Sequence, residues 1–318
     1  MSLVAAFTGL FEDPRVVVAT AGADQAGAVS RVSPDDAPAD GRFEIGSVTK
    51  TMTATLLALL AAEGRLRLDD PVGTWLDAGA NAEITLRELA THTSGLPPVA
   101  PGYDLRQADR LNPWADFTAK LAEDGLRQAQ RAPGGAWQYS NFGYQLLGLI
   151  LERASGQPYP DLLSERLLEP LGMTSSGAGQ RAGTPLLPGH VRGREVPHRD
   201  HPVPGPGGVR ATAGDLARYV RACLCPPAGP LGAAITAAQE PQVPIDAGHG
   251  QALAWIVVDG NLRGHTGGTT GFSSCVIIDP AQGQAVGLLA SSHGCGEALA
   301  RAARAVLAGK DPRPPAAG

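Results

Sequence analysis

Lysine is scarce in this sequence: the 318 residues include 26 basic ones, of which only those at positions 50, 120 and 310 are lysines. Arginine keeps its proton in proteins, whereas a buried lysine can lose it and act as a base. A lysine at the start of a long apolar stretch in such an arginine-rich chain is therefore a candidate for proton transfer, and Lys50 has this position.

The chain also lacks runs of basic residues, and its formal net charge is −5. Nucleic acid and anionic membrane surfaces are therefore poor candidates for partners. No stretch approaches the roughly 18 uninterrupted apolar residues that a membrane span needs. The N-terminus has no basic residue before its apolar part and carries Glu12 and Asp13, unlike a secretion signal, so we expect a cytoplasmic protein.

Cysteine is rare and forms no C-x-x-C pair, which favours reduced structural thiols at Cys223, Cys225, Cys275 and Cys295. A second group of metal-ligating side chains lies in a proline-rich stretch and consists of His190, His198, Asp200 and His201. Because such a stretch offers neither a rigid scaffold nor a clear fourth ligand, we expect no metal and no other cofactor.

Hydrophobic periodicity divides the chain into two kinds of segment. A period of two predicts strands near both ends, at 15–21, 27–32, 252–258, 262–265, 272–278 and 285–290. The middle of the chain is mostly helical. We therefore predict a discontinuous α/β domain (residues 1–72 and 246–308), an inserted helical domain (73–245) and a disordered tail (309–318). An active site would lie at the seam between the two domains.

Capping signals predict where the helices begin and end. A helix over Ser47–Glu63 ends at Gly64, and Thr85 and Glu88 have the spacing of a capping box. Further helices are expected after the caps Asn112 and Ser140, and over 2–12, 161–171, 212–225, 231–239 and 297–307. The segment 174–208 is rich in proline and has no periodicity, which predicts a functional surface loop or lid.

Ser47 and Lys50 have S-x-x-K spacing, which places both side chains on one face of the predicted helix within its first turn. A helix N-terminus favours negative charge, and burial lowers the pKa of a lysine, so the pair suits a serine nucleophile beside a basic amine. The alternative is an N-capping serine with a lysine that extends to solvent. This stretch alone leaves both interpretations open.

Two further motifs carry polar groups at the ends of predicted elements. In Tyr139-Ser140-Asn141, a tyrosine whose pKa is lowered by a nearby ammonium could act as general base, and the amide could hold a substrate carbonyl. In the second, residues 265–268 (HTGG), the glycines let a substrate approach a strand. Helix caps and a turn are the plain alternatives. His92 is expected to hydrogen-bond within a tight turn.

Taken in order, S-x-x-K, Y-x-N and H-T-G make the chain resemble the serine β-lactamase and penicillin-binding-protein superfamily, in the branch of class C β-lactamases, DD-peptidases, D-aminopeptidases and related esterases. The resemblance extends from about Phe43 to Ser292 and includes FEIGSVTKTMTATLLALLAAEGRLRLDDPV, ITLRELATHTSGLP, PGGAWQYSNFGYQLLGLILERASG and GHTGGTTGFSS. It implies a β-lactamase-like α/β fold, with an antiparallel sheet flanked by terminal helices and an inserted helical domain.

The resemblance also implies roles for individual residues. Ser47 would be the acylated nucleophile, Lys50 would help to take its proton, and Tyr139 would be the general base of acylation. Asn141 would hold the carbonyl of the substrate. The backbone N–H groups of Ser47 and Gly268 would form the oxyanion hole.

His265, Thr266 and Gly267 occupy the position of the family's third motif, on the substrate-binding strand. β-Lactamases and DD-peptidases generally have a lysine in place of this histidine, and that lysine helps to bind a carboxylate. A histidine is mostly neutral at pH 7. Within the family it occurs among D-aminopeptidase-like and esterase-like members, so the resemblance favours those over a true β-lactamase.

The resemblance therefore implies a serine acyl-enzyme hydrolase that cleaves an amide or ester of a small molecule or short peptide. One alternative is a transacylase that passes the acyl group from Ser47 to an amine or alcohol, as in relatives that modify natural products, with 98–112 and 174–208 shaping the acceptor site. Another is a non-catalytic binding or sensor protein. Such proteins usually lose a motif residue, whereas all four of Ser47, Lys50, Tyr139 and Asn141 remain here.

Overall fold

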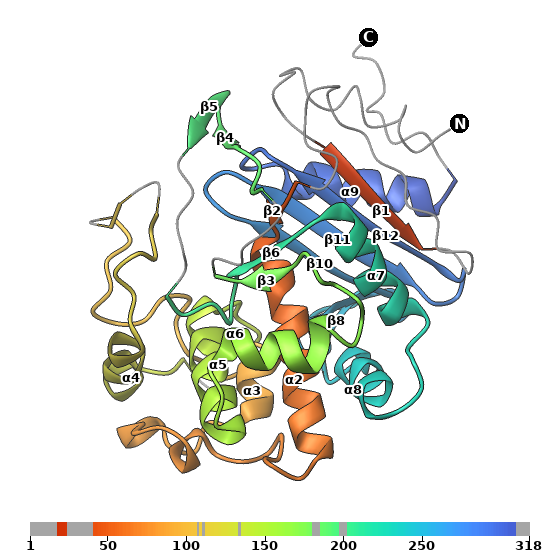
Figure 1. Cartoon of the computed structure of the whole chain (residues 1–318). Helices are drawn as coiled ribbons and strands as arrows, with labels where there is room; N and C mark the ends of the chain where they lie inside the picture. The colour runs from red at the N-terminus through yellow and green to blue at the C-terminus, as the bar shows by residue number, and fades with distance from the viewer. Residues whose placement is uncertain are drawn as a thin grey trace.

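A seven-stranded antiparallel sheet forms one side of the molecule, and most of the helices gather on the other (Figure 1). The computed structural model describes residues 18–23 and 41–309, apart from 107, 110–111, 133–134, 180–184 and 197–201. The predicted helix 2–12, the predicted strand 27–32 and all but the first residue of the predicted tail 309–318 lie outside these residues.

The strands of this sheet run in the order β1-β12-β11-β10-β9-β8-β7. The first strand pairs with the last, Val18 opposite Ala290, which confirms that both ends of the chain build one sheet. The predicted strand 252–258 is wrong in its first half, because Ala252 N–H donates to Trp255 O across a bend. The bounds are β1 Val18–Ala23, β7 Val243–Pro244, β8 His249–Gln251, β9 Ile256–Val258, β10 Leu262–Gly268, β11 Ser273–Asp279 and β12 Gln284–Ala290.

Helices cover both faces of the sheet. α9 (Gly296–Leu307) packs on β11 and β12 from one side, and α7 (Ala213–Leu224) packs on β1, β11 and β12 from the other. Cys275 and Ile277 belong to the apolar cluster of α9, whereas Val276 belongs to the main core. Because side chains alternate across a strand, this double cover buries β11 along its whole length.

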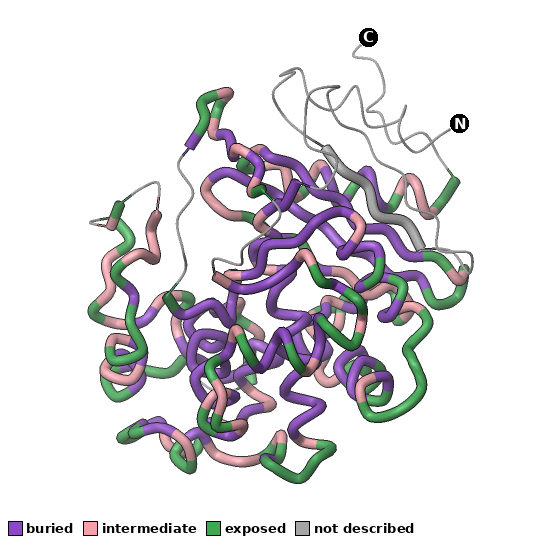
Figure 2. Tube along the Cα trace, in the orientation of Figure 1, coloured by how far each residue is buried: buried purple, intermediate pink, exposed green. Residues whose placement is uncertain are grey.

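The central helix is α2 (Thr49–Ala62), which a short 3₁₀ turn, Gly46–Val48, precedes. Every residue from Thr49 to Leu60 is buried, as the purple tube in Figure 2 shows. α2 packs against α5 and α8. The predicted apolar helix is therefore confirmed, although its N-terminal half also buries the four hydroxyl groups of Thr49, Thr51, Thr53 and Thr55.

Two small sheets lie near the N-terminus of α2. One has the order β2-β6-β3, formed by Phe43–Glu44, Val209–Ala211 and Gly177–Ala178, and the other is the hairpin of β4 (Gly189–Val191) and β5 (Arg194–Val196). No strand is predicted at Phe43–Glu44, and this short strand pairs with β6 rather than with the main sheet.

The expectation of a surface loop over 174–208 is wrong at its C-terminal end. Residues 203–206 are buried. A Cβ atom on Gly205 would lie 2.8 Å from the carbonyl oxygen of Tyr144 and 3.1 Å from the Cα atom of Gly148, both in α5. This part of the chain therefore packs closely against α5 and does not form a lid that could open.

Capping predictions are confirmed for two helices, and a third helix has a cap that was not predicted. Thr85 and Glu88 form a capping box at α3 (Leu86–Ala90). Ser140 caps α5 (Asn141–Ser155), which ends at Gly156 with φ 74°. The side chain of Thr212 accepts from Asp215 N–H at the start of α7. In each case a side-chain oxygen satisfies a backbone N–H that the first helical turn leaves unpaired.

Two helix predictions are wrong in their bounds. α4 (Ala119–Gln128) begins after Thr118 rather than Asn112, because turns occupy the intervening residues. The helix predicted over 161–171 is a short α6 (Tyr159–Leu163) that continues as a π-helical turn (Ser164–Leu168). The last two helices, α8 (Pro230–Gln239) and α9, match their predicted bounds to within one residue. Short 3₁₀ turns occupy Val72–Thr74 and Gly79–Asn81.

One apolar core passes through both predicted domains, from Leu86 and Phe142 in the helical part to Val276 and Leu289 in the sheet. α7, within the range assigned to the helical domain, packs on the sheet. The domain boundaries at residues 72 and 245 therefore stay a prediction. Within the described ranges, no helix is both long and apolar enough to span a membrane.

Candidate active site

Ser47 lies where the 3₁₀ turn meets α2, and its hydroxyl oxygen has two donors. Lys50 Nζ donates to Ser47 Oγ at 3.0 Å, from one helical turn further along. Tyr139 OH donates to the same oxygen at 2.8 Å, from the residue before the cap of α5. Three of the predicted catalytic residues thus meet at one atom, although 92 positions separate Ser47 from Tyr139.

Lys50 is completely buried, and its ammonium group has three hydrogen-bond acceptors. Besides Ser47 Oγ, these are Asn141 Oδ1 at 2.7 Å and the carbonyl oxygen of Pro206 at 2.9 Å. The Nζ atom also lies over the ring of Tyr139, 4.9 Å from its centroid. Burial lowers the pKa of Lys50 well below 10.5, because the interior disfavours the charged form.

The geometry contradicts one expectation about Tyr139. Burial raises the pKa of its phenol to about 12, and the hydrogen bond to Ser47 offsets this only in part. From the sequence, we expect the positive charge of Lys50 to lower the pKa of Tyr139. Desolvation outweighs that effect here because Lys50 itself favours the neutral form in the same buried environment. Tyr139 is therefore a protonated donor at neutral pH.

His92 supports Tyr139 from behind. Its ring lies 4.6 Å from the ring of Tyr139, tilted by 36°, and 5.2 Å from that of Tyr144. His92 Nδ1 accepts from the backbone N–H of Ser140 at 3.2 Å, so its hydrogen bond joins the turn to the start of α5 and does not lie within the turn, contrary to the expectation from the sequence. Its backbone adopts φ 59°, a conformation that few residues other than glycine tolerate.

The edge of β10 lies directly against the start of α2. A Cβ atom on Gly46, whose φ is 49°, would meet the backbone N of Gly268 at 2.6 Å. A Cβ on Gly267 would meet the carbonyl oxygen of Ile45 at 2.1 Å. Only glycine permits this approach, which brings the peptide groups of Ser47 and Gly268 to the same cavity. The assignment of their N–H groups to an oxyanion hole stays a prediction.

The other third-motif residues alternate along β10. His265 is buried, and burial together with the nearby Lys50 lowers its pKa to about 4. Its ring centroid lies 6.3 Å from that of Tyr139. Thr266 is exposed and Gly267 is buried. His265 is thus neutral at pH 7, as expected, and the described cavity wall includes Gly268 but none of these three residues.

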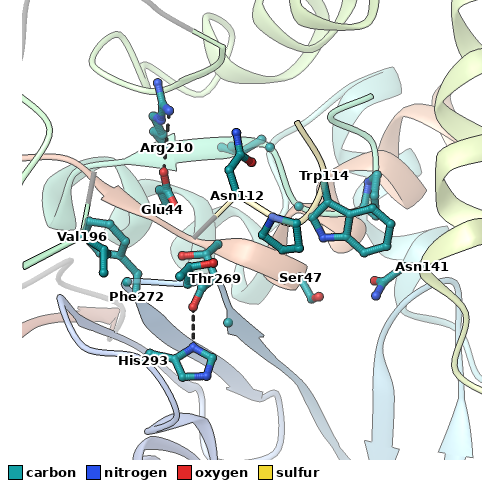
Figure 3. Close-up of a pocket in the computed structure, with 18 of the residues that line it drawn as sticks. Glu44, Ser47, Asn112, Trp114, Asn141, Val196, Arg210, Thr269, Phe272 and His293 are labelled. Atoms are coloured by element: carbon teal, nitrogen blue, oxygen red, sulfur yellow. Dashed lines mark hydrogen bonds and ion pairs between the residues drawn. The ribbon is translucent and has the colours of Figure 1, made fainter. Parts of the chain in front are cut away.

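A cavity of about 340 Å³ opens beside Ser47 (Figure 3). Ser47, Asn141 and Trp114 lie together at one end, and the ion pair of Arg210 with Glu44, at 3.6 Å, lies at the other. Apolar groups and glycine backbone make up much of the remaining wall, including Pro113, Val196, Val209, Gly271 and Phe272. The arrangement suits an extended, largely apolar substrate that reaches Ser47 with one end.

An aromatic cluster holds Trp114 at this wall. Its ring stacks on that of Tyr103, with 5.8 Å between centroids and 11° between planes, and meets Phe117 edge-on at 5.7 Å. Tyr103 OH donates to the carbonyl oxygen of Pro113 at 2.7 Å. These contacts hold Pro113 and Trp114 in place at the cavity wall.

The family model described as Beta-lactamase matches residues 3–310. The chain belongs to the β-lactamase family. It is 33% identical over 194 residues to the D-alanyl-D-alanine-carboxypeptidase/endopeptidase AmpH of Escherichia coli (strain K12), a match that covers 58% of this chain and 49% of AmpH. The chain thus spans about half the length of this curated relative.

Solved structures in the β-lactamase family share the fold. The octameric penicillin-binding protein homologue from Pyrococcus abyssi has a TM-score of 0.80 and 25% identity, with 98% of this chain and 78% of that chain covered. A β-lactamase from Sulfitobacter sp. EE-36 has a TM-score of 0.77 and 22% identity, over 92% of this chain and 91% of that chain. The predicted β-lactamase-like α/β fold is confirmed.

The sequence missed several groups of this family site. The carbonyl oxygen of Pro206 accepts from Lys50 Nζ, and a backbone group of this kind has no sequence signature. The buried threonines of α2 lie within a stretch that the sequence presents as apolar. His190 binds the carbonyl oxygen of Ser291, while His198, Asp200 and His201 lie outside the described residues. Among the residues described, no cluster of three metal-ligating side chains occurs, and the four cysteines are free thiols.

Proposed function

We propose that this chain is a serine acyl-enzyme hydrolase of the β-lactamase family that cleaves an uncharged ester or amide through Ser47. The observation that carries the proposal is the double hydrogen bond to Ser47 Oγ from Lys50 at 3.0 Å and Tyr139 at 2.8 Å, beside an open cavity. A nucleophile in contact with a base that a third group orients is the arrangement that covalent catalysis requires.

The three acceptors around Lys50 support its role as the base. In the neutral amine, two N–H groups remain, and Asn141 Oδ1 and the Pro206 carbonyl can only accept. The amine therefore donates to these two oxygens and directs its lone pair at Ser47. Ser47 Oγ attacks the substrate carbonyl while its proton passes to Lys50 Nζ, and the backbone N–H groups of Ser47 and Gly268 stabilise the oxyanion.

Collapse of the tetrahedral intermediate breaks the bond to the leaving group, which takes its proton from Tyr139 OH. Lys50 then returns a proton to the phenolic oxygen. Tyr139 suits this relay because its pKa of about 12 keeps it protonated between turnovers. Water then attacks the ester on Ser47 with Lys50 again as the base, which releases the acid and restores the enzyme.

The charges of the site favour an uncharged substrate. A carboxylate would gain from a lysine at the first position of the third motif, but His265 is buried and neutral there, with a pKa near 4. The cavity's Arg210 already binds Glu44. We therefore expect simple esters and amides to react faster than substrates with a free carboxylate, such as β-lactams and peptides with a terminal D-alanine.

A second candidate, acyl transfer, draws on the size of the cavity. About 340 Å³ next to Ser47, with a defined aromatic wall at Trp114, leaves room for an amine or alcohol beside the acyl group. If such an acceptor excludes water, the same acyl-enzyme yields a new amide or ester. Incubating an ester with and without amines, and weighing the products by mass spectrometry, separates transfer from hydrolysis.

Covalent labelling tests the nucleophile. A fluorophosphonate should modify the wild-type protein at the peptide that contains Ser47, and Ser47→Ala should abolish labelling. Ser155→Ala, at the far end of α5, is the matched serine control and should label as the wild type does. Labelling that survives in Ser47→Ala, or a wild-type protein that neither labels nor turns over esters, would contradict the proposal.

A further inference from the structure

Two of the buried threonines of α2, Thr49 and Thr53, lie where loop 204–209 crosses the helix. The loop is held at both ends by side chains of α2. Thr53 Oγ1 donates to the carbonyl oxygen of Gly205 at 2.7 Å, and the N–H of Val209 donates to Thr49 Oγ1 at 3.2 Å. Between these two contacts, the carbonyl oxygen of Pro206 accepts from Lys50 Nζ at 2.9 Å. The loop's contact with the base thus depends on the same helix that carries the base.

The direction of the hydrogen bonds around Thr53 follows from counting protons. Its hydroxyl has one proton and two acceptors within reach, Gly205 O at 2.7 Å and Thr49 O, one turn back in the helix, at 3.2 Å. Tyr159 OH lies 2.7 Å from the same hydroxyl oxygen. Burial raises the pKa of Tyr159, so the phenol keeps its proton and donates it to Thr53.

A chain of donors therefore runs from Tyr159 to Thr53 to Gly205. All three residues are buried, and the exposed fraction of Tyr159 and of Thr53 is no more than 1%. Gly205 also presses on α5, where a Cβ atom would lie 2.8 Å from Tyr144 O. The Gly205–Pro206 peptide bond, which contains the Gly205 carbonyl, is thus fixed from two sides, and the next carbonyl along the chain is that of Pro206, which accepts from Lys50.

We propose that Thr53, oriented by Tyr159, is a positioning residue that holds the Gly205–Pro206 peptide so that the Pro206 carbonyl directs the Lys50 amine toward Ser47. The inference rests on the proposed role of Lys50 as proton acceptor. Without the contact to Gly205, the Pro206 carbonyl shifts, and Lys50 loses one of the two acceptors that orient its lone pair. The ammonium form also loses an acceptor, so Lys50 gives up its proton at lower pH.

The test compares four single variants and one double variant, Thr53→Val/Tyr159→Phe, in the rate of fluorophosphonate labelling as a function of pH. Thr53→Val keeps the shape of the side chain but lacks the hydroxyl, and Thr53→Ser keeps the hydroxyl. Thr55→Val is the matched control, because Thr55 is similarly buried in α2 and donates to the carbonyl of Thr51, within the helix, at 3.0 Å, rather than to loop 204–209. Tyr159→Phe removes the donor that orients Thr53.

We expect Thr53→Val to lower the limiting rate by about tenfold or more, as the loss of a hydrogen bond to a charged group does. Its rate should begin to rise at lower pH than in the wild type. Thr53→Ser and Thr55→Val should keep the wild-type profile. The limiting rate of Tyr159→Phe should lie between those of the wild type and Thr53→Val, because the freed Thr53 hydroxyl can turn to Thr49 O. The double variant Thr53→Val/Tyr159→Phe should have the same profile as Thr53→Val alone.

A Thr53→Val profile equal to that of Thr55→Val would overturn the inference. So would a crystal structure of Thr53→Val in which the Pro206 carbonyl still lies within hydrogen-bond distance of Lys50 Nζ. If Thr53→Val does not fold, a wild-type profile for Tyr159→Phe decides against it. A wild-type protein that does not label at all refutes the proposed function instead, so the two failures are distinct.

Discussion

At the scale of single residues, two groups compete for the proton of Ser47, and their pKa values separate them. The pKa of Lys50 is lowered well below 10.5 by burial, whereas that of Tyr139 is raised to about 12. As pH rises, Lys50 therefore loses its proton first. The rate of acylation should increase with pH as the neutral amine forms, and Tyr139 stays protonated throughout that rise.

Tyr139→Phe tests this order. Without the phenol, Ser47 loses one hydrogen bond and the leaving group loses its proton donor, so acylation by an ester should fall by about 100-fold. The rise of rate with pH should persist, because it reports Lys50. The measurement is the pH profile of kcat/KM. A variant whose rate no longer depends on pH would show that tyrosinate, rather than lysine, is the base.

The residues of this site differ in how far sequence could predict them. Ser47, Lys50, Tyr139 and Asn141 stand in spaced motifs, and the structure brings them together. The Pro206 carbonyl could not be predicted, because a backbone group has no signature of its own. The pKa of Tyr139 was predicted in the wrong direction, because burial in the folded protein, which a motif does not record, decides it.

At the scale of elements, the join between β10 and α2 decides the geometry of catalysis. Ser47 follows Gly46 in the 3₁₀ turn that leads into α2, and a Cβ atom on Gly46 would collide with Gly268 N at 2.6 Å and Gly268 O at 2.8 Å. Ser274 Oγ also donates to the carbonyl oxygen of Ile45 at 2.7 Å, from β11. The sheet therefore sets where the helix starts.

Gly46→Ala should separate these two elements. We expect acylation to fall by at least about tenfold and the protein to lose about 1–3 kcal/mol of stability from overpacking, besides the strain of its positive φ. Gly64→Ala is the matched control: its φ is 70°, but no atom lies within 4 Å of the added Cβ. Urea unfolding measures the loss of stability, and ester hydrolysis measures the loss of activity, in each variant. Equal activity losses in the two variants would contradict this account.

Element boundaries were predictable where a local cap defines them. Thr85 and Ser140 each satisfy a helix N-terminus with their own side chains, and both boundaries were predicted correctly. Asn112 has the same chemistry, yet no helix begins there. Residues 112–114 instead pack with Tyr103 and Phe117 at the cavity, a tertiary contact that overrides the local preference.

At the scale of the whole molecule, the helical part and the sheet interlock across the site. Trp137 Nε1 donates to Gln251 Oε1 at 2.8 Å, and Ala254 N–H donates to Ala90 O at 3.0 Å. The main apolar core is continuous between the two parts. Sequence periodicity showed that strands lie at both ends of the chain, but it carries no information on how tightly the inserted helices join them.

This interlocking predicts that the two parts unfold together. Independent domains would give separate transitions, whereas a shared core makes the loss of one part expose apolar surface of the other. Urea unfolding followed by far-UV circular dichroism and by fluorescence of the four tryptophans should give coincident curves with one midpoint. Gly46→Ala should move both curves by the same amount, because its strain lies at the junction. Circular dichroism and fluorescence curves with different midpoints would contradict this prediction and show that one part stays folded after the other has unfolded.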